Sequence, residues 1–324
     1  MRILAVDDDP IILELLAEFI ADIGNQTLVT ANSAAEALSI VEGSALDPFD
    51  FFLLDIQMPG MNGIELTKLI QQQGKYRDTP IIMLTAMADK AYIDAAFAAG
   101  ATDYVTKPFE ANDLRGRLAL IEMAVTAKRG SKTRPVALQS QPLAFNEPIG
   151  LNEPISLFDV ENVISHTAME NYALQLARGE IFGSSTFAFA IRDIETLHDD
   201  LCPFEFHSLI SDVAEVISDT LAGHQFLMTY SGSGVFVCVT ERKWAPVTEK
   251  LMDQVNLCLS QTELYKNNGE TLDVRVSVGR SVRFVWKSGR RILDALGEAH
   301  EQAEQARAAF EDHRLDFWAV SQNA

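Results

Sequence analysis

Short continuous apolar runs alternate with stretches of helical apolar spacing along the first 125 residues. Residues 3–6 form a short apolar run, and residues 10–23 carry apolar side chains at the spacing of one helix face. The change from apolar run to amphipathic helix occurs five times, which predicts an α/β domain with a doubly wound, parallel five-stranded sheet. The predicted strands are 3–6, 26–31, 51–54, 80–84 and 103–105, and the predicted helices are 10–23, 34–42, 63–73, 89–99 and 112–126.

The pattern changes after residue 152. Short strands and helices follow in the order βαββαβ, with a further helix and strand at the end, which is typical of an α+β domain with an antiparallel sheet. The sequence SGSG separates two apolar runs and predicts a hairpin. The predicted elements are a helix within 153–179, strands 186–192, 225–230, 235–240, 272–278 and 315–320, and helices 206–221, 244–261 and 290–310.

Residues 126–152 predict a flexible linker between these two parts. They contain several prolines with scattered Ser, Gln and Asn, and they are basic where both flanks are acidic. The expected organisation is therefore a first domain at 1–125, the linker, and a second domain at 153–324. A tandem echo, NEPIGL followed by NEPISL, spans residues 146–157, but no longer period follows it, so a solenoid is not indicated.

The chain is strongly acidic, with 26 Lys and Arg against 46 Asp and Glu and a formal net charge of −20. This charge repels nucleic-acid phosphates and anionic lipid, so we expect no nucleic-acid partner. No apolar stretch approaches the ~20 residues that span a bilayer, and the N-terminus does not resemble a signal peptide. We therefore expect no membrane insertion and a cytoplasmic location. The three cysteines lack metal-site spacing, which fits a reducing compartment.

Polar side chains stand where the strands of the first domain end. Asp7 and Asp8 follow the first strand, Asp55 the third, Thr85 the fourth and Lys107 the fifth. Because the carboxyl ends of parallel strands meet at one edge of the sheet, we expect these side chains to converge. Converging carboxylates raise one another's pKa unless a cation lies between them, and oxygen ligands favour Mg²⁺. A carboxylate beside Mg²⁺ and a lysine can accept a phosphoryl group as an acyl phosphate.

The motifs VDDDP, LLDIQMPGMNG, LTA and DYVTKPF resemble, in order and spacing, those of the receiver domain of two-component response regulators. The resemblance covers about residues 1–125 and implies a flavodoxin-like fold with strand order 2-1-3-4-5. It implies that Asp55 is the phosphoacceptor. It also implies that Mg²⁺ is bound by Asp7, Asp8 and Asp55 together with the main-chain carbonyl of Gln57.

The same resemblance implies the parts of a switch. Thr85 would be the switch hydroxyl, Lys107 would contact the phosphoryl group, and Tyr104 would move inward when Thr85 is recruited. A histidine kinase or a phosphotransfer protein would donate the phosphoryl group, and a phosphorylation-dependent homodimer is a further expectation. The alternative for each loop acid is the capping of a helix, which is the interpretation we favour for Asp9.

The motifs TYSGSGVFVCV, DVRVSVGRS and EAHEQAEQAR resemble those of the GGDEF domain of diguanylate cyclases, which implies a ferredoxin-like fold over about residues 153–320. The hairpin that reads GGDEF in that family reads SGSGV here. By this resemblance Ser233 replaces a metal-ligating acid, Gly234 replaces an acid that assists deprotonation, and Asp193 alone matches a remaining ligand. Because phosphoryl transfer depends on metal binding and positioning, we expect this degenerate domain not to be an enzyme.

The sequence therefore predicts a response regulator of a phosphorelay. It would receive a phosphoryl group on Asp55 and signal through a catalytically inactive GGDEF-like output by contact with an unknown downstream protein. Two alternatives stay open. In the first, the second domain senses GTP or cyclic di-GMP without turnover, and in the second it is an active diguanylate cyclase in spite of its losses.

Overall fold

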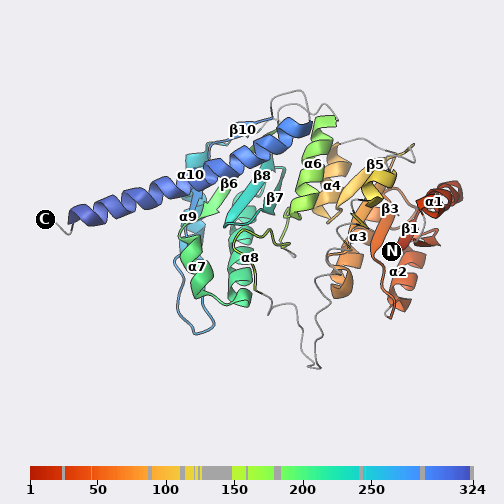
Figure 1. Ribbon diagram of the computed structural model, residues 1–324, viewed down its shortest axis with the longest axis horizontal. Helices are drawn as coiled ribbons and strands as arrows, with labels where there is room; N and C mark the ends of the chain where they lie inside the picture. Colours follow the sequence, from red (N-terminus) through yellow and green to blue (C-terminus); the bar gives the residue numbers. More distant parts are fainter. Residues whose placement is uncertain are drawn as a thin grey trace. The chain divides into compact units, whose positions relative to one another are not determined.

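The fold is described from a computed structural model of the chain (Figure 1). The chain separates into two compact units, Met1–Ser140 and Gln141–Ala324. The predicted linker falls largely outside the described residues, and the division into domains at 125 and 153 stays a prediction. The structure describes residues 1–23, 26–44, 46–86, 90–109, 114–119, 121–122, 125, 148–157, 160–178, 184–240, 244, 246–284 and 289–321.

The first unit is built on five parallel strands in the order β2-β1-β3-β4-β5. This confirms the predicted parallel sheet and the flavodoxin-like strand order. The strands are β1 (Arg2–Val6), β2 (Thr27–Ala31), β3 (Phe51–Asp55), β4 (Ile81–Thr85) and β5 (Asp103–Thr106). The helices are α1 (Pro10–Ile23), α2 (Ala34–Gly43), α3 (Gly63–Gln72), the 3₁₀ turn η1 (Gly74–Tyr76) and α4 (Lys90–Ala98), and residues 114–119 and 121–122 are also helical.

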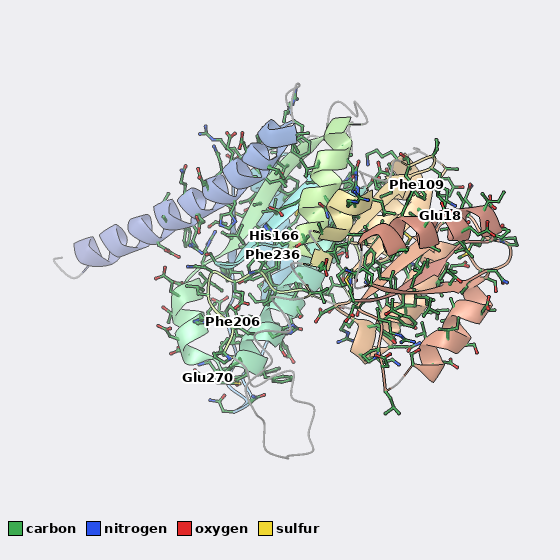
Figure 2. The ribbon with its side chains drawn as sticks, turned by 45° about the vertical axis from the view of Figure 1, so that its right-hand side comes forward. Glu18, Phe109, His166, Phe206, Phe236 and Glu270 are labelled. Atoms are coloured by element: carbon green, nitrogen blue, oxygen red, sulfur yellow. The ribbon has the colours of Figure 1, made fainter. Side chains whose placement is uncertain are left out.

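Helices cover both faces of this sheet, because successive strand residues point to opposite sides. One face packs against α1 and the helical residues 114–119 and 121–122. On this side the ring of Phe109 lies edge-on to that of Phe19, with centroids 6.3 Å apart (Figure 2). On the other face the ring of Phe52 packs edge-on against that of Tyr76, with the ring centroids 5.2 Å apart. Burial on both faces explains why the central strands read as continuous apolar runs.

The second unit contains an antiparallel sheet with helices. Four strands follow the order β10-β6-β8-β7, β9 also pairs with β6, and every pairing is antiparallel. The strands are β6 (Ser185–Ile191), β7 (Phe226–Tyr230), β8 (Val235–Thr240), β9 (Val276–Val278) and β10 (Val282–Arg283). The helices are α6 (His166–Arg178), α7 (Ile194–Asp200), α8 (Pro203–Thr220), α9 (Thr248–Gln261) and α10 (Gly289–Ser321).

The core of the second unit lies between the sheet and the helices α8 and α9. Phe206 of α8 and Phe236 of β8 belong to it (Figure 2), together with Phe187 and Phe189 of β6. Helices α6 and α10 contact the sheet and each other, and the C-terminal part of α10 extends beyond the sheet (Figure 1). Within the described residues, no helix has the length and apolar composition needed to cross a membrane.

The strand predicted at 315–320 is wrong, because α10 runs without interruption from Gly289 to Ser321. The apolar residues near the end of the chain favoured a strand, but no Gly or Pro stands between residue 298 and the end of α10 to stop the helix. The strand predicted at 272–278 is shorter, covering Val276–Val278, and α9 begins four residues later than predicted. The short elements α7 and β10 were not predicted.

Candidate functional site

Three carboxylates gather at the carboxyl edge of the first sheet. Asp7 follows β1, Asp55 is the last residue of β3, and oxygens of Asp7, Asp8 and Asp55 all lie within 4.8 Å of one another. Asp7 and Asp55 are buried, whereas Asp8 is exposed. Ionised carboxylates at this separation repel one another, so the cluster is stable only when positive charge is supplied to it.

Lys107 supplies one positive charge. Its Nζ lies 2.6 Å from Oδ2 of Asp7 and 2.9 Å from Oδ1 of Asp55, so one ammonium group donates to both buried carboxylates. The main chain fixes the start of the lysine side chain, because the Lys107 N–H donates to the carbonyl of Thr85 at 2.6 Å. The following peptide bond, to Pro108, is cis. Strands β4 and β5 thus place the lysine over the end of β3.

Burial raises the pKa of Asp55 above its ordinary value, and the charges of Asp7 and Asp8 add to this effect. The hydrogen bond and charge of Lys107 lower the pKa of Asp55 without cancelling the rise. For Lys107, burial opposes the charged form, but its hydrogen bonds and ion pairs with Asp7 and Asp55 raise the pKa. One cation therefore faces three carboxylates. An all-oxygen set of this charge fits a hard divalent cation such as Mg²⁺.

Gly63 holds the loop beneath Asp55 in place. A Cβ at this position would lie 2.1 Å from the main-chain oxygen of Asp55, so only glycine allows α3 to begin so close to the end of β3. The Gly63 N–H donates to the carbonyl of Ile56 at 3.1 Å. A capping box between Asn62 and Glu65 then starts α3. Sequence reasoning missed the positioning role of Gly63, although a glycine directly after a capping Asn was a visible signal.

The remaining residues of the predicted site lie nearby along the chain. Thr85 ends β4 and is buried, and Gln57 is exposed two residues after Asp55. Tyr104 is already buried, with its ring 6.2 Å from that of Phe97 in an edge-on arrangement. The inward movement of Tyr104 and the role of the Gln57 carbonyl stay predictions. The capping role of Asp9 is confirmed, because its Oδ1 accepts from the Ile11 N–H at 2.9 Å.

Residues 3–119 match the protein family described as "Response regulator receiver domain". The "Chemotaxis protein CheY homolog" of Campylobacter jejuni subsp. jejuni serotype O:23/36 is 31% identical over 118 residues, which are 36% of this chain and 89% of that protein. This chain belongs to the response regulator receiver family. The match includes the five parallel strands of the first unit and ends before the second unit.

Two further similarities concern the same share of the chain. The "Transcriptional regulatory protein YvrH" of Bacillus subtilis is 37% identical over 116 residues, 36% of this chain and 46% of that protein. The crystal structure of "Chemotaxis response regulator CheY4 of Vibrio cholerae" has 32% identity, covers 37% of this chain and 97% of its own, and gives a TM-score of 0.35. The chain spans about half the length of the first curated relatives it matches, at 46% and 53%.

The second unit holds the three residues of the predicted degenerate cyclase site. Ser233 and Gly234 lie in the turn between β7 and β8, with φ of 53° and 74°. Asp193 follows β6 with φ of 52°, and its N–H donates to Oε1 of Glu311 at 3.0 Å. The Ile191 N–H donates to the carbonyl of Gly234 at 2.9 Å, so the turn and the end of β6 are held together. Of the three residues of the predicted cyclase site, Asp193 alone carries a carboxylate.

The turn between β7 and β8 also contacts α10. Nη1 of Arg307 donates to the carbonyl of Ser233 at 2.7 Å, and Oγ of Ser231 lies 2.8 Å from Nδ1 of His300. Inside the turn, the Gly234 N–H donates to the hydroxyl of Tyr230 at 3.1 Å. Burial raises the pKa of Tyr230 to about 12, so this hydroxyl stays protonated at neutral pH. The turn is therefore a well-bonded part of the second unit.

Proposed function

We propose that this chain is a response regulator of a phosphorelay, in which Asp55 receives a phosphoryl group and the second unit is a catalytically inactive GGDEF-like output that acts by protein–protein contact. The observation that carries this proposal is the position of Lys107, whose ammonium group bonds both Asp7 and Asp55 within a domain of the receiver family. A carboxylate paired with a lysine and with free capacity for a divalent cation is suited to phosphoryl transfer.

In the proposed reaction, an oxygen of Asp55 attacks the phosphorus of a phosphohistidine. The new O–P bond forms as the P–N bond breaks, and the electron pair stays with the imidazole nitrogen of the donor. Lys107 then faces a phosphoryl oxygen in place of part of its contact with Asp55. Asp7, Asp8, Asp55 and the Gln57 carbonyl would hold Mg²⁺, which when bound supplies positive charge to the phosphoryl oxygens. A buried hydroxyl at Thr85 is suited to bonding the new phosphoryl group.

The assignment of the second unit rests on its strand order and on its missing acids. The antiparallel order β9-β6-β8-β7 supports a ferredoxin-like arrangement of the GGDEF type. The turn offers Ser233 and Gly234 where a cyclase needs a metal ligand and an acid. A two-metal transfer loses most of its rate without these groups, so we propose that GTP is not converted by this domain. A radiolabelled GTP assay on the beryllofluoride-treated chain would reject this proposal by detecting cyclic di-GMP.

The donor in this proposal is a histidine kinase or a phosphotransfer protein, and the recipient of the signal is a protein. The thiols of Cys202, Cys238 and Cys258 are free, which supports a reducing, cytoplasmic setting. A sensor of GTP or cyclic di-GMP is the alternative output. Isothermal titration of the full chain with each nucleotide separates the two outputs, and the protein-contact proposal requires that neither nucleotide gives binding heat.

Labelling of the intact chain tests the receiver half of the proposal. Acetyl phosphate with Mg²⁺ should add the mass of one phosphoryl group to the wild-type chain, and Asp55→Asn should abolish the addition. Asp9→Asn is the matched control, because it makes the same chemical change after β1, next to Asp8, while keeping a side chain that caps α1. Labelling of Asp55→Asn, or loss of labelling in Asp9→Asn, would reject the assignment of Asp55.

A further inference from the structure

Residues 148–157, here called the strap, lie across the turn between β7 and β8. Ile149, Leu151 and Ile155 of the strap are partly buried and pack against the core of the second unit, and Leu157 belongs to that core. The first five of these residues fall within the segment whose composition predicts a linker. The end of the predicted linker is therefore attached to the second unit at the degenerate cyclase turn.

The strap bonds the turn directly. The N–H of Ser233 donates to the carbonyl of Leu151 at 2.7 Å, and Oγ of Ser233 donates to Oδ1 of Asn152 at 2.8 Å. Gly232 is buried beneath the strap, and a Cβ added to it would lie 2.5 Å from the main-chain oxygen of Asn152. The strap thus bonds both the N–H and the hydroxyl of Ser233, while α10 bonds the Ser233 carbonyl through Arg307.

The rest of the strap is lightly held. Nε2 of His198 lies 2.7 Å from the carbonyl of Ile149, and the Glu153 N–H donates to the carbonyl of Gly150 at 3.0 Å within the strap itself. Gly150, Asn152 and Glu153 are exposed. Because Ile149, Leu151 and Ile155 are only partly buried and Asn152 and Glu153 are exposed, the strap opens at a lower free energy than the fully buried strands beneath it.

We propose that the strap is an autoinhibitory latch on the degenerate turn, which opens as a unit while the sheet stays folded. In the closed state Leu151 and Asn152 exclude any other partner from Ser233. The apparent affinity of any partner for the turn is then its intrinsic affinity multiplied by the fraction of molecules in which the strap is open. Because the strap includes the last five residues of the predicted linker, a signal from the receiver would reach the strap before the rest of the second unit. This regulatory step rests on the proposed function, whereas the latch itself does not.

Hydrogen–deuterium exchange of the full chain tests the latch. Asn152→Ala removes the acceptor of the Ser233 hydroxyl and should accelerate exchange of the strap and of the Ser233 amide about fivefold, the effect of one typical hydrogen bond. Strands β6 and β8 should exchange as in the wild type. The matched control is Asn268→Ala, which removes an exposed acceptor, that of the Glu270 N–H at 2.9 Å, and should change neither region. Equal effects of the two variants, or acceleration of β8 together with the strap, would overturn the latch.

A glycine pair gives an independent test that does not depend on the asparagine. Gly232 and Gly223 have φ of 91° and 98°, so alanine carries the same conformational cost at both positions. Only at Gly232 would the new Cβ meet the strap, because nothing lies within 4 Å of a Cβ at Gly223. Gly232→Ala should therefore accelerate exchange of the strap, and Gly223→Ala should not. Protection of the strap in Gly232→Ala would overturn the proposal.

The regulatory step is tested by adding beryllofluoride and Mg²⁺ to the same exchange experiment. We expect the receiver peptides around Asp55 to gain protection and the strap to exchange faster. Protection around Asp55 with an unchanged strap would reject the regulatory step and leave the proposed function standing. An unchanged receiver would instead reject the proposed function, and the Asn152 and Gly232 variants would still decide the latch.

Discussion

Lys107 bonds both Asp7 and Asp55, and its one positive charge does not balance the three converging acids. Because burial raises the pKa of Asp55, the folded state binds a proton at this residue more tightly than the unfolded chain does. The free energy of unfolding therefore falls as the pH rises from the ordinary aspartate value, 3.8, through the raised value of the folded state. Ionisation of the buried Asp55 carboxylate therefore lowers the free energy of unfolding.

Asp55→Asn should for this reason raise the urea midpoint at pH 7 in buffer containing EDTA. Asparagine keeps an oxygen that can accept from Lys107 but removes the buried charge. The difference in urea midpoint between this variant and the wild type should shrink as the pH is lowered below the ordinary aspartate pKa. Asp55 of the wild type is then neutral in both the folded and the unfolded state. Unfolding followed by circular dichroism at several pH values checks this expectation. A variant that is less stable than wild type at pH 7 would contradict it.

Gly63→Ala should disturb the same site through the main chain. The added methyl group would lie 2.1 Å from the Asp55 carbonyl oxygen, so either α3 or the end of β3 must shift. We expect a loss of about 2–4 kcal/mol in the free energy of unfolding and slower labelling by acetyl phosphate. Gly74→Ala is the control, because its Cβ would meet nothing within 4 Å. Equal stability of the two variants would show that the loop adapts freely.

At the scale of elements, the capping box that starts α3 sits directly after the loop carrying Asp55. The Glu65 N–H donates to Oδ1 of Asn62 at 2.9 Å, and the Asn62 N–H donates to Oε2 of Glu65 at 3.2 Å. Asn62→Ala should lower the free energy of unfolding by ~1 kcal/mol, and Asn62→Asp should retain most of the stability because aspartate caps equally well. Urea unfolding of both variants measures the difference. A neutral Asn62→Ala would mean that α3 is held by packing alone.

Elements with strong local signals were predictable, and those fixed by distant contacts were not. β1 and β3 were predictable from their continuous apolar runs, and α8 from apolar side chains at a period of 3.6 residues. The family motifs led to Asp55 and Lys107. The end of α10 was misread because its apolar residues favour a strand only in isolation. Residues 148–152 of the strap were predicted as linker because the contact of Asn152 with Ser233 joins residues 81 positions apart, which composition does not reveal.

At the scale of the whole chain, two separate cores imply two separate unfolding events. Calorimetry should show two transitions rather than one, since a chain with two cores need not unfold in a single step. Gly63→Ala should lower only the transition of the receiver, and Gly232→Ala should lower only the other. The double variant should show the sum of both effects within about 0.5 kcal/mol. A single shared transition that responds to both substitutions would contradict this expectation.

Because residues 148–152 are attached to the second unit, they determine where a foreign domain can be fused to this unit without removing its contacts. A chimera that joins a foreign receiver at the compositional boundary, residue 153, would discard Leu151 and Asn152 and leave Ser233 without these acceptors. A junction before residue 148 preserves them. Fusions that carry the second unit should therefore keep residues 148–152 with it, as part of its fold.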